Sequence, residues 1–171
     1  MTAPLQAMRI MLVDDNPHMR AILHSILDGL GVRQIMECAD GATALNTLRA
    51  WPADIVIVDY QMAPVDGVQF TYLVRNAPDS TDPYLPIIMA TAYADKKRVY
   101  EARDAGVTEI IVKPITPRAV IDRLNYVIFK PRPFVRAEGY FGPCRCRKDE
   151  ATFQGPWRRS GDAQPAQAQA G

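Results

Sequence analysis

The sequence predicts an α/β protein: an open, doubly wound (βα)5 parallel sheet followed by an irregular C-terminal tail. Three observations predict this fold. Five short apolar runs lie within the first 115 residues, segments with a helical apolar period separate them, and the composition changes near residue 130. Strands that alternate with helices favour a parallel sheet covered by helices on both faces.

Apolar runs of four to six residues mark the predicted strands. Two of them, at 55–58 and 110–113, are continuous and β-branched, which is typical of central strands buried on both faces. No run is long enough to cross a bilayer as a helix, so we expect no membrane insertion. The predicted strands are IMLV (10–13), IMEC (35–38), IVIV (55–58), PIIMAT (86–91) and IIVK (110–113).

The segments between the predicted strands have helical spacing. Asn16 is suited to cap a helix whose first residue is Pro17. The stretch NAPDSTDPYLP (76–86) is instead rich in Pro, Asp and Ser, which predicts a long surface loop. The helices are expected over 17–30, 41–50, 66–75, 95–105 and 116–129.

Charge and composition divide the chain near Lys130. Residues 1–130 contain thirteen Lys/Arg and fifteen Asp/Glu, whereas residues 131–171 contain seven and four, and six of those seven are Arg. The second part is also rich in Pro, Gly, Gln and Ala, and its sparse apolar residues predict little core. We expect a flexible N-terminus (1–7), a folded domain (8–129) and an Arg-rich extension (130–171).

Three cysteines, Cys38, Cys144 and Cys146, accompany no visible export signal. An odd number of cysteines without such a signal favours free thiols in a reducing cytoplasm, so we expect a cytoplasmic protein. The Cys-x-Cys pair lacks a second pair nearby, and both histidines lie far upstream, so it does not indicate a zinc site.

Polar side chains follow four of the predicted strands. Asp14 and Asp15 follow the first strand and Asp59 follows the third, while Thr91 ends the fourth and Lys113 ends the fifth. In an open α/β sheet, ligands bind at the carboxyl ends of the strands, near the point where the strand order reverses. The sequence therefore predicts one crevice that holds three carboxylates, a hydroxyl and an ammonium group.

That crevice has the chemistry of a phosphoryl-accepting site. Clustered carboxylates are most simply neutralised by a hard divalent cation, and oxygen ligands favour Mg²⁺. Asp59 could then attack a phosphoryl group to form an aspartyl phosphate, with Lys113 and the Thr91 hydroxyl contacting the phosphoryl oxygens. The alternative is that Asp14 and Asp15 are a solvated loop and Asp59 caps a helix.

Four motifs resemble the receiver domain of two-component response regulators, the CheY-like family: VDDNP (13–17), VDYQMAPVDG (58–67), TAY (91–93) and KPI (113–115). The resemblance covers about residues 8–129 and implies a flavodoxin-like receiver fold, an upstream histidine kinase and no conventional enzyme activity. It also implies a cis bond before Pro114. The site residues that it implies are the phosphoacceptor Asp59, the metal ligands Asp14, Asp15, Asp59 and the Gln61 backbone carbonyl, and the phosphate-sensing Thr91 and Lys113.

Two positions depart from the family pattern. Ile110 stands three residues before the lysine, where the family often has an aromatic switch residue. Tyr93 could replace that aromatic ring or could be a surface residue on a partner-binding face. The loop after Asp59 has its proline at Pro64, with Ala63 where the family usually has it.

The extension repeats one pattern, in YFGPCRCR (140–147) and FQGPWRR (153–159): aromatic residues, Gly-Pro and arginines. Arginine offers guanine a bidentate hydrogen-bonding edge, and aromatic rings offer a stacking face. A carboxylate such as Asp162 could accept from guanine N1–H and N2–H. The candidate nucleotide-binding residues are Arg132, Arg136, Tyr140, Arg145, Arg147, Trp157, Arg158, Arg159 and Asp162.

The extension resembles that of a subset of CheY-like proteins that bind cyclic di-GMP through an Arg-rich tail, on the segments RPFVR (132–136), YFGPCRCR (140–147) and GPWRRSGD (155–162). The resemblance implies that the tail orders around the dinucleotide and that the protein acts on the flagellar motor or on surface attachment. The Cys-Arg-Cys after the first Gly-Pro is a departure from that subset. The competing interpretation is that Trp157 is a core anchor against the receiver.

We therefore predict a single-domain response regulator that acts as a cyclic di-GMP effector. The alternative is a conventional phospho-receiver, switched at Asp59 by a histidine kinase, whose tail docks a protein partner. A third alternative, non-specific nucleic-acid binding through the tail, is weaker because acidic residues dilute the tail's positive charge. Specific DNA binding is not expected. A hydrolytic enzyme is not expected either, because the first strand is not followed by an Asp-x-Asp motif.

Overall fold

The computed structural model describes residues 3–92 and 95–145. Its centre is a five-stranded parallel sheet with strand order β2-β1-β3-β4-β5. This order confirms the predicted doubly wound fold. The strands are β1 (Arg9–Val13), β2 (Gln34–Cys38), β3 (Ile55–Asp59), β4 (Ile87–Thr91) and β5 (Glu109–Val112).

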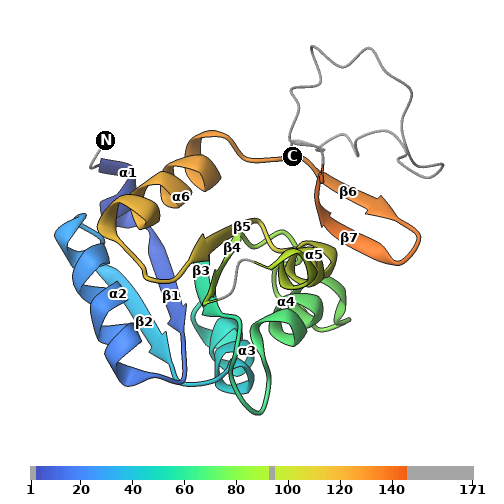
Figure 1. The fold of residues 1–171 in the computed structure, drawn as a ribbon, viewed down its shortest axis with the longest axis horizontal. Coiled ribbons are helices and arrows are strands. Elements are labelled where there is room, and N and C mark those ends of the chain that lie inside the picture. The colour runs from blue at the N-terminus through green and yellow to red at the C-terminus, as the bar shows by residue number, and fades with distance from the viewer. Residues whose placement is uncertain (1–2, 93–94, 146–171) are drawn as a thin grey trace.

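Five helices cover the two faces of the sheet, as Figure 1 shows. α2 (Pro17–Gly29) and α6 (Pro117–Phe129) cover one face, and α3 (Gly41–Ala50), α4 (Gly67–Asn76) and α5 (Lys96–Ala105) cover the other. Each begins after a residue whose side chain accepts a hydrogen bond from the first turn, because the first backbone N–H groups of a helix have no partner within it. These capping residues are Asn16, Asp40, Asp66, Asp95 and Thr116.

The helix and strand ends agree with the sequence prediction to within one residue. A short helix that was not expected, α1 (Ala3–Ala7), precedes the first strand. The flexibility predicted for residues 1–7 stays a prediction. Among the described residues, no helix is both long enough and apolar enough to span a membrane.

Alternating side chains of the sheet build two apolar layers. In β3, Val56 and Val58 face α3, α4 and α5, whereas Ile55 and Ile57 face α2 and α6. All five β3 residues are buried, which is the consequence of its central position between β1 and β4. Burial on both faces fixes the register of β3 and hence the position of Asp59 at its end.

The extension departs from the prediction of an irregular tail. Residues Phe134–Ala137 (β6) and Tyr140–Pro143 (β7) form an antiparallel hairpin, and Gly139 at its turn has φ 72°. Phe141 is only 5% exposed, so this part of the extension contributes to the core. The prediction was wrong here because each strand has four residues and completes its apolar contacts with a distant loop.

Aromatic rings attach the hairpin to that loop. Phe134 and Phe141 lie 5.6 Å apart, and each lies 5.1 Å from Tyr84, measured between ring centroids. Tyr84 belongs to the 76–86 stretch, which was predicted to be a surface loop. The hairpin thus packs against this loop, and the contact consists of the three aromatic rings.

A buried arginine stabilises the same contact. Arg75 donates from Nε to the Gly106 carbonyl (3.1 Å) and from Nη1 to the Pro83 carbonyl (2.9 Å), and its guanidinium lies 5.0 Å from the Phe134 ring centroid. Burial lowers the pKa of Arg75 to about 10, so the side chain is still charged at neutral pH. Carbonyl oxygens and an aromatic face compensate this buried cation, which forms no ion pair with a carboxylate among residues 3–92 and 95–145.

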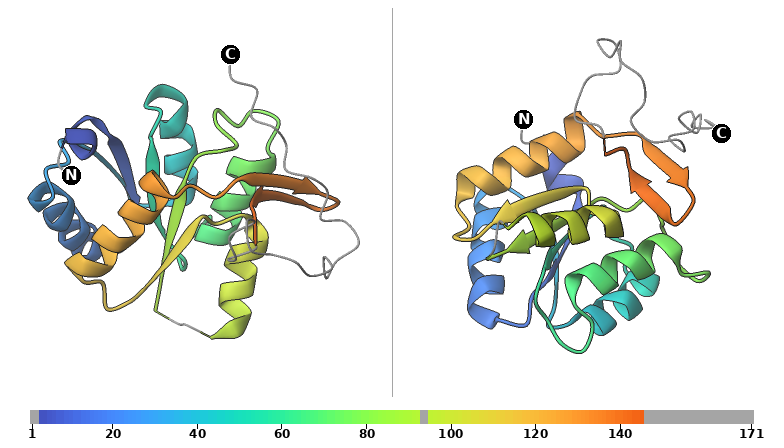
Figure 2. Two further views of the ribbon diagram at one scale, coloured as in Figure 1. Left: turned by 90° about the horizontal axis from the view of Figure 1, so that it is seen from above. Right: turned by 45° about the vertical axis from the view of Figure 1, so that its right-hand side comes forward.

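Close packing explains the glycine in the first Gly-Pro of the repeated pattern. A Cβ atom on Gly142 would lie 2.8 Å from Gly106 Cα and 2.7 Å from Tyr140 Oη, so only glycine allows this approach. Tyr140 Oη donates to the Pro143 carbonyl at 2.7 Å. β7 thus packs directly on the end of α5, beside the last turn of α4, as the two views of Figure 2 show.

We expect the hairpin to contribute measurably to the free energy of unfolding. Phe141→Ala should lower the free energy of unfolding by about 3 kcal/mol, because it empties a buried aromatic site. Phe129→Ala is the matched control; Phe129 is 54% exposed, so its loss should cost less than about 1 kcal/mol. Urea unfolding of both variants measures the difference, and equal losses would contradict the packing described here.

Candidate functional site

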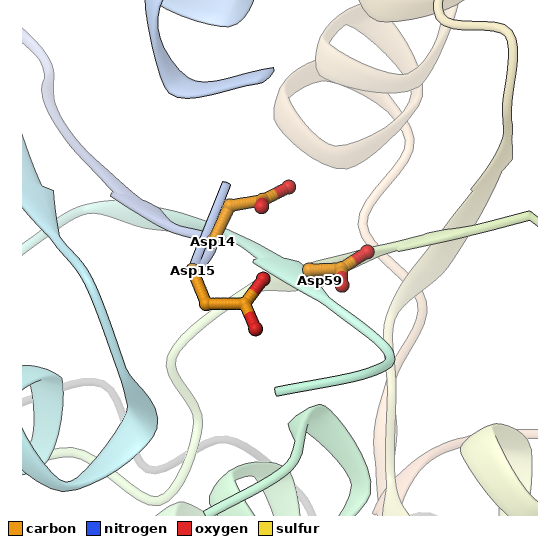
Figure 3. A group of neighbouring side chains, drawn as sticks. All are labelled: Asp14, Asp15 and Asp59. Atoms are coloured by element: carbon orange, nitrogen blue, oxygen red, sulfur yellow. The ribbon is translucent and has the colours of Figure 1, made fainter. Parts of the chain in front are cut away.

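The predicted acidic residues meet at the carboxyl ends of β1 and β3. Figure 3 shows that Asp14, Asp15 and Asp59 are neighbours, and one carboxylate oxygen from each lies within 4.8 Å of the others. Asp14 and Asp59 are 2% and 7% exposed, while Asp15 is exposed to solvent. The loop after β1 and the end of β3, two neighbouring interior strands, thus supply a half-open cluster of oxygen atoms.

Lys113 supplies the counter-charge of the cluster. Its Nζ lies 2.7 Å from Asp59 Oδ1 and 3.4 Å from Asp14 Oδ2. The backbone N–H of Lys113 donates to the Thr91 carbonyl at 2.8 Å, which fixes the lysine beside the end of β4. The bond between Lys113 and Pro114 is cis, as the resemblance implied.

Burial and the ion pair act in opposite directions on Asp59. Burial raises the pKa of the Asp59 carboxyl above its ordinary value, although the hydrogen bond from Lys113 lowers it. Burial alone would lower the pKa of Lys113, but its contacts with Asp59 and Asp14 outweigh burial and raise it. Lys113 is therefore charged at neutral pH. For Asp59, the effect of burial on the pKa outweighs that of the contact with Lys113.

The loop after β3 holds Asp59 in place. The Gln61 backbone N–H donates to Asp59 Oδ2 at 3.1 Å. A Cβ on Gly67 would lie 2.3 Å from the Asp59 carbonyl oxygen, so the start of α4 approaches the strand end as only glycine permits. The residue that caps α4 is Asp66. The alternative interpretation of Asp59 as a helix cap is therefore wrong.

The cluster has the donor chemistry of a magnesium site. Asp14, Asp15 and Asp59 offer only oxygen atoms, and Mg²⁺ prefers a few carboxylates with room for water. Asp14 is positioned by the Asn16 backbone N–H, which donates to its Oδ1 at 2.8 Å. The role of the Gln61 carbonyl as a further ligand stays a prediction.

Two contacts beside the cluster were not found by sequence reasoning. Arg20 Nη1 donates to the Asp14 carbonyl at 2.6 Å, and Tyr60 Oη donates to Glu101 Oε2 at 2.5 Å. Burial and the bond to Glu101 raise the pKa of Tyr60 to about 12, so the hydroxyl keeps its proton. Tyr60 lies in the motif at 58–67, directly after Asp59, but no local pattern connects Tyr60 with Glu101 or Arg20 with Asp14.

Thr91 is the last residue of β4 and is 3% exposed. Ile110, at the position where the family often has an aromatic residue, is half-buried and packs against the core layer of α3, α4 and α5. Tyr93 lies outside the described residues. The phosphate-sensing role of Thr91 and Lys113 stays a prediction.

Four of the candidate nucleotide-binding residues are described, and all four make contacts with other described residues. Arg132 donates to the carbonyls of Thr108 and Cys144 and lies 3.4 Å from the buried Glu109 carboxylate. Tyr140 Oη is bonded within the hairpin, as above. The Arg145 guanidinium carbon lies 3.7 Å from the Tyr140 ring centroid, and its Nη1 lies 3.4 Å from Asp104 Oδ1.

Arg136 is exposed and stacks over the Phe141 ring, with its guanidinium carbon 4.4 Å from the ring centroid. The remaining candidate nucleotide-binding residues lie outside the described residues: Arg147, Trp157, Arg158, Arg159 and Asp162.

A sheet of this order, with an acidic cluster and a lysine at its carboxyl edge, defines a receiver domain. Residues 10–125 match the response regulator receiver domain family. The chain therefore belongs to the response regulator receiver family, with an extension after the matched range. As a CheY-like member of that family, it is a phospho-acceptor domain and not a conventional enzyme.

Two curated relatives illustrate the similarity. The chain is 35% identical to chemotaxis protein CheY-3 of Vibrio cholerae serotype O1 over 120 residues, which cover 70% of this chain and 91% of that protein. It is 33% identical to chemotaxis protein CheY of Pseudomonas aeruginosa over 120 residues, which cover 70% of this chain and 95% of that protein.

Solved structures show the same fold. Chemotaxis protein CheY4 of Vibrio cholerae superposes with a TM-score of 0.66 at 28% identity, over 71% of this chain and all of that chain. The receiver domain of a sensor histidine kinase from Pseudomonas aeruginosa PAO1 superposes with a TM-score of 0.62 at 26% identity, over 69% of this chain and 94% of that chain. That structure has a magnesium ion coordinated in its active site cleft.

Proposed function

We propose that this chain is a phospho-receiver switched at Asp59 by a histidine kinase, in signalling that controls chemotaxis or motility. The observation that carries the proposal is the position of Asp59: a buried carboxylate at the end of the central strand, 2.7 Å from Lys113 Nζ and clustered with Asp14 and Asp15. The matching relatives are named as chemotaxis proteins, which supports the motility role and a motility protein as the downstream partner.

Asp59 is the nucleophile in the proposed reaction. One of its carboxylate oxygens attacks the phosphorus of a phosphohistidine on the kinase, and an O–P bond forms as the P–N bond breaks. The electron pair of the broken bond returns to the imidazole of the kinase. The product is an aspartyl phosphate, in which Asp59 no longer carries a carboxylate charge.

The neighbouring residues stabilise the transferred phosphoryl group. Lys113 already contacts Asp59 Oδ1, and a small movement of its flexible side chain brings Nζ to a phosphoryl oxygen. The Thr91 hydroxyl, at the end of the adjacent strand, donates to another. Mg²⁺ held by Asp14, Asp15, Asp59 and the Gln61 backbone carbonyl would neutralise phosphoryl charge when it is bound.

A phosphorylation assay tests this proposal. Unmodified protein incubated with acetyl phosphate and Mg²⁺ should gain one phosphoryl group, measured by intact mass, and Asp59→Asn should gain none because the amide is not a nucleophile. Asp28→Asn is the matched control; its side chain is 59% exposed on α2 and it should be phosphorylated normally. Phosphorylation of Asp59→Asn, or none of the unmodified protein, would contradict the proposal.

Binding of cyclic di-GMP by the extension is a second candidate function. Its support is the repeated pattern of aromatic residues, Gly-Pro and arginines, together with exposed Arg136, whose guanidinium edge is presented beside an aromatic ring. Arg132 and Arg145 contact the receiver domain instead, so they give it less support. In this candidate, the remainder of the extension orders around the dinucleotide.

Calorimetric titration of cyclic di-GMP into the full chain tests the second candidate. It predicts micromolar or tighter binding that Asp59→Asn retains and Arg159→Ala weakens by about tenfold or more, since one bidentate contact is worth about 1–3 kcal/mol. Arg33→Ala, at a surface arginine whose side chain is 66% exposed, serves as the control and should bind normally. If the unmodified chain gives no binding heat, this candidate is wrong and phosphorylation at Asp59 is unaffected.

A further inference from the structure

An apolar groove lies between α4 and α5, on the face of the domain away from α2 and α6. Its volume is about 530 Å³, and we name it the α4–α5 groove. Val65, Val68, Tyr72 and Leu73 form its apolar wall, and Glu101 and Asp104 lie along its α5 side. Tyr72 is 57% and Leu73 37% exposed, which is unusual for large apolar side chains that adjoin one another.

The described end of the chain reaches this groove. Residue 145 is the last that the structure describes, and Arg145 Nη1 lies 3.4 Å from Oδ1 of Asp104, which lines the groove. Twenty-six residues of the sequence follow. The chain therefore enters its C-terminal segment beside an apolar surface that the described residues leave uncovered.

The first copy of the repeated pattern shows how such a sequence docks on these helices. In Gly142-Pro143-Cys144-Arg145, the glycine packs against Gly106 at the end of α5 and the arginine pairs with Asp104. Phe141, just before the glycine, is buried. The interaction thus has three parts: a glycine that packs closely on the helix end, a buried aromatic ring, and an arginine that pairs with a carboxylate of α5.

The second copy keeps part of this pattern. Gly155-Pro156-Trp157-Arg158 repeats Gly-Pro-x-Arg, with Phe153 two residues before the glycine, where the first copy has Tyr140, and Arg159 after it. Gln154 stands where the first copy has the buried Phe141, so the large apolar side chain of the second copy is Trp157, after the proline. Its tryptophan can supply a large apolar surface, and its two arginines can supply positive charge next to that surface. The α4–α5 groove offers the complement: an apolar wall beside the carboxylates of Glu101 and Asp104.

The connection between the two copies is long enough. Trp157 lies twelve positions after Arg145, and an extended chain of that length spans up to about 40 Å. Even a bent connection can therefore place Trp157 in a groove that Arg145 already adjoins. A short tether also gives the segment an effective concentration in the millimolar range, which favours its own groove over that of another molecule.

We propose that residues 153–159 dock in the α4–α5 groove of the same molecule, with Trp157 on the apolar wall and its following arginines near Glu101 and Asp104. This interaction does not depend on phosphorylation of Asp59 or on a nucleotide. It gives the repeated pattern one explanation: both copies attach the extension to α4 and α5, the first at their carboxyl ends and the second along the groove between them.

Tryptophan fluorescence of the full chain tests the proposal. In Trp51→Phe, Trp157 is the sole tryptophan, so its emission is measured directly. With Trp51 kept, the Trp157 emission is obtained by subtracting the spectrum of Trp157→Phe from that of the unmodified protein. We expect a blue-shifted Trp157 emission that is protected from acrylamide. Tyr72→Ser should weaken docking about tenfold, the order expected for one aromatic contact, and shift both readouts toward those of an exposed indole.

Tyr126→Ser, at a 39% exposed tyrosine on α6, is the matched control and should leave both readouts unchanged. Three results would overturn the proposal. The first would be an exposed Trp157 in the unmodified chain, which would leave the groove to a different protein. The second would be protection of Trp157 that Tyr72→Ser does not change. The third would be protection that is lost on dilution, which would assign the groove to a second copy of the chain.

Discussion

Mutual repulsion of three carboxylates, offset by one lysine, is the interaction on which the rest of this structure depends. Asp14 and Asp59 are buried near each other, and Lys113 is the cation that contacts both. The parallel sheet makes this possible because it brings strand ends that are 45 and 54 residues apart in sequence to one edge. Burial still disfavours the Asp59 charge, as its raised pKa shows. The site is thus suited to accept a further cation and a phosphoryl group that removes the carboxylate charge.

Two helices, α4 and α5, contact both the acidic site and the extension. α4 begins at Gly67, against the Asp59 carbonyl, and its penultimate residue, Arg75, lies under the Phe134 ring of the hairpin. α5 carries Glu101, which accepts from Tyr60, and β7 packs on Gly106, the residue that caps the C-terminus of α5. The acidic site at one end and the attachment of the extension at the other therefore involve the same two helices, α4 and α5.

The fold and the acidic site could be predicted from the sequence because their signals are local. Apolar runs gave the strands, Asn16 and Pro17 gave the start of a helix, and residues at strand ends gave the site. The hairpin could not be predicted in this way. Its four-residue strands are stabilised by Tyr84 and Arg75, about 50 to 65 residues earlier in the chain, and no local pattern encodes that contact. For the same reason no local pattern encodes the contacts of Arg132 with Thr108 and Glu109, or of Arg145 with Asp104.

The most direct test of the account is thermal unfolding of the unmodified chain in Mg²⁺ and in EDTA, beside Asp15→Asn. Asp15 is the exposed member of the cluster, so its amide variant should fold normally and lose mainly metal affinity. If the three carboxylates form a divalent-cation site, Mg²⁺ at about a hundred times its dissociation constant stabilises the unmodified protein by about 2.7 kcal/mol and raises its melting temperature. The melting temperature of Asp15→Asn should rise clearly less in Mg²⁺. Identical melting temperatures in Mg²⁺ and EDTA for the unmodified chain would contradict the central claim that this cluster is a cation site.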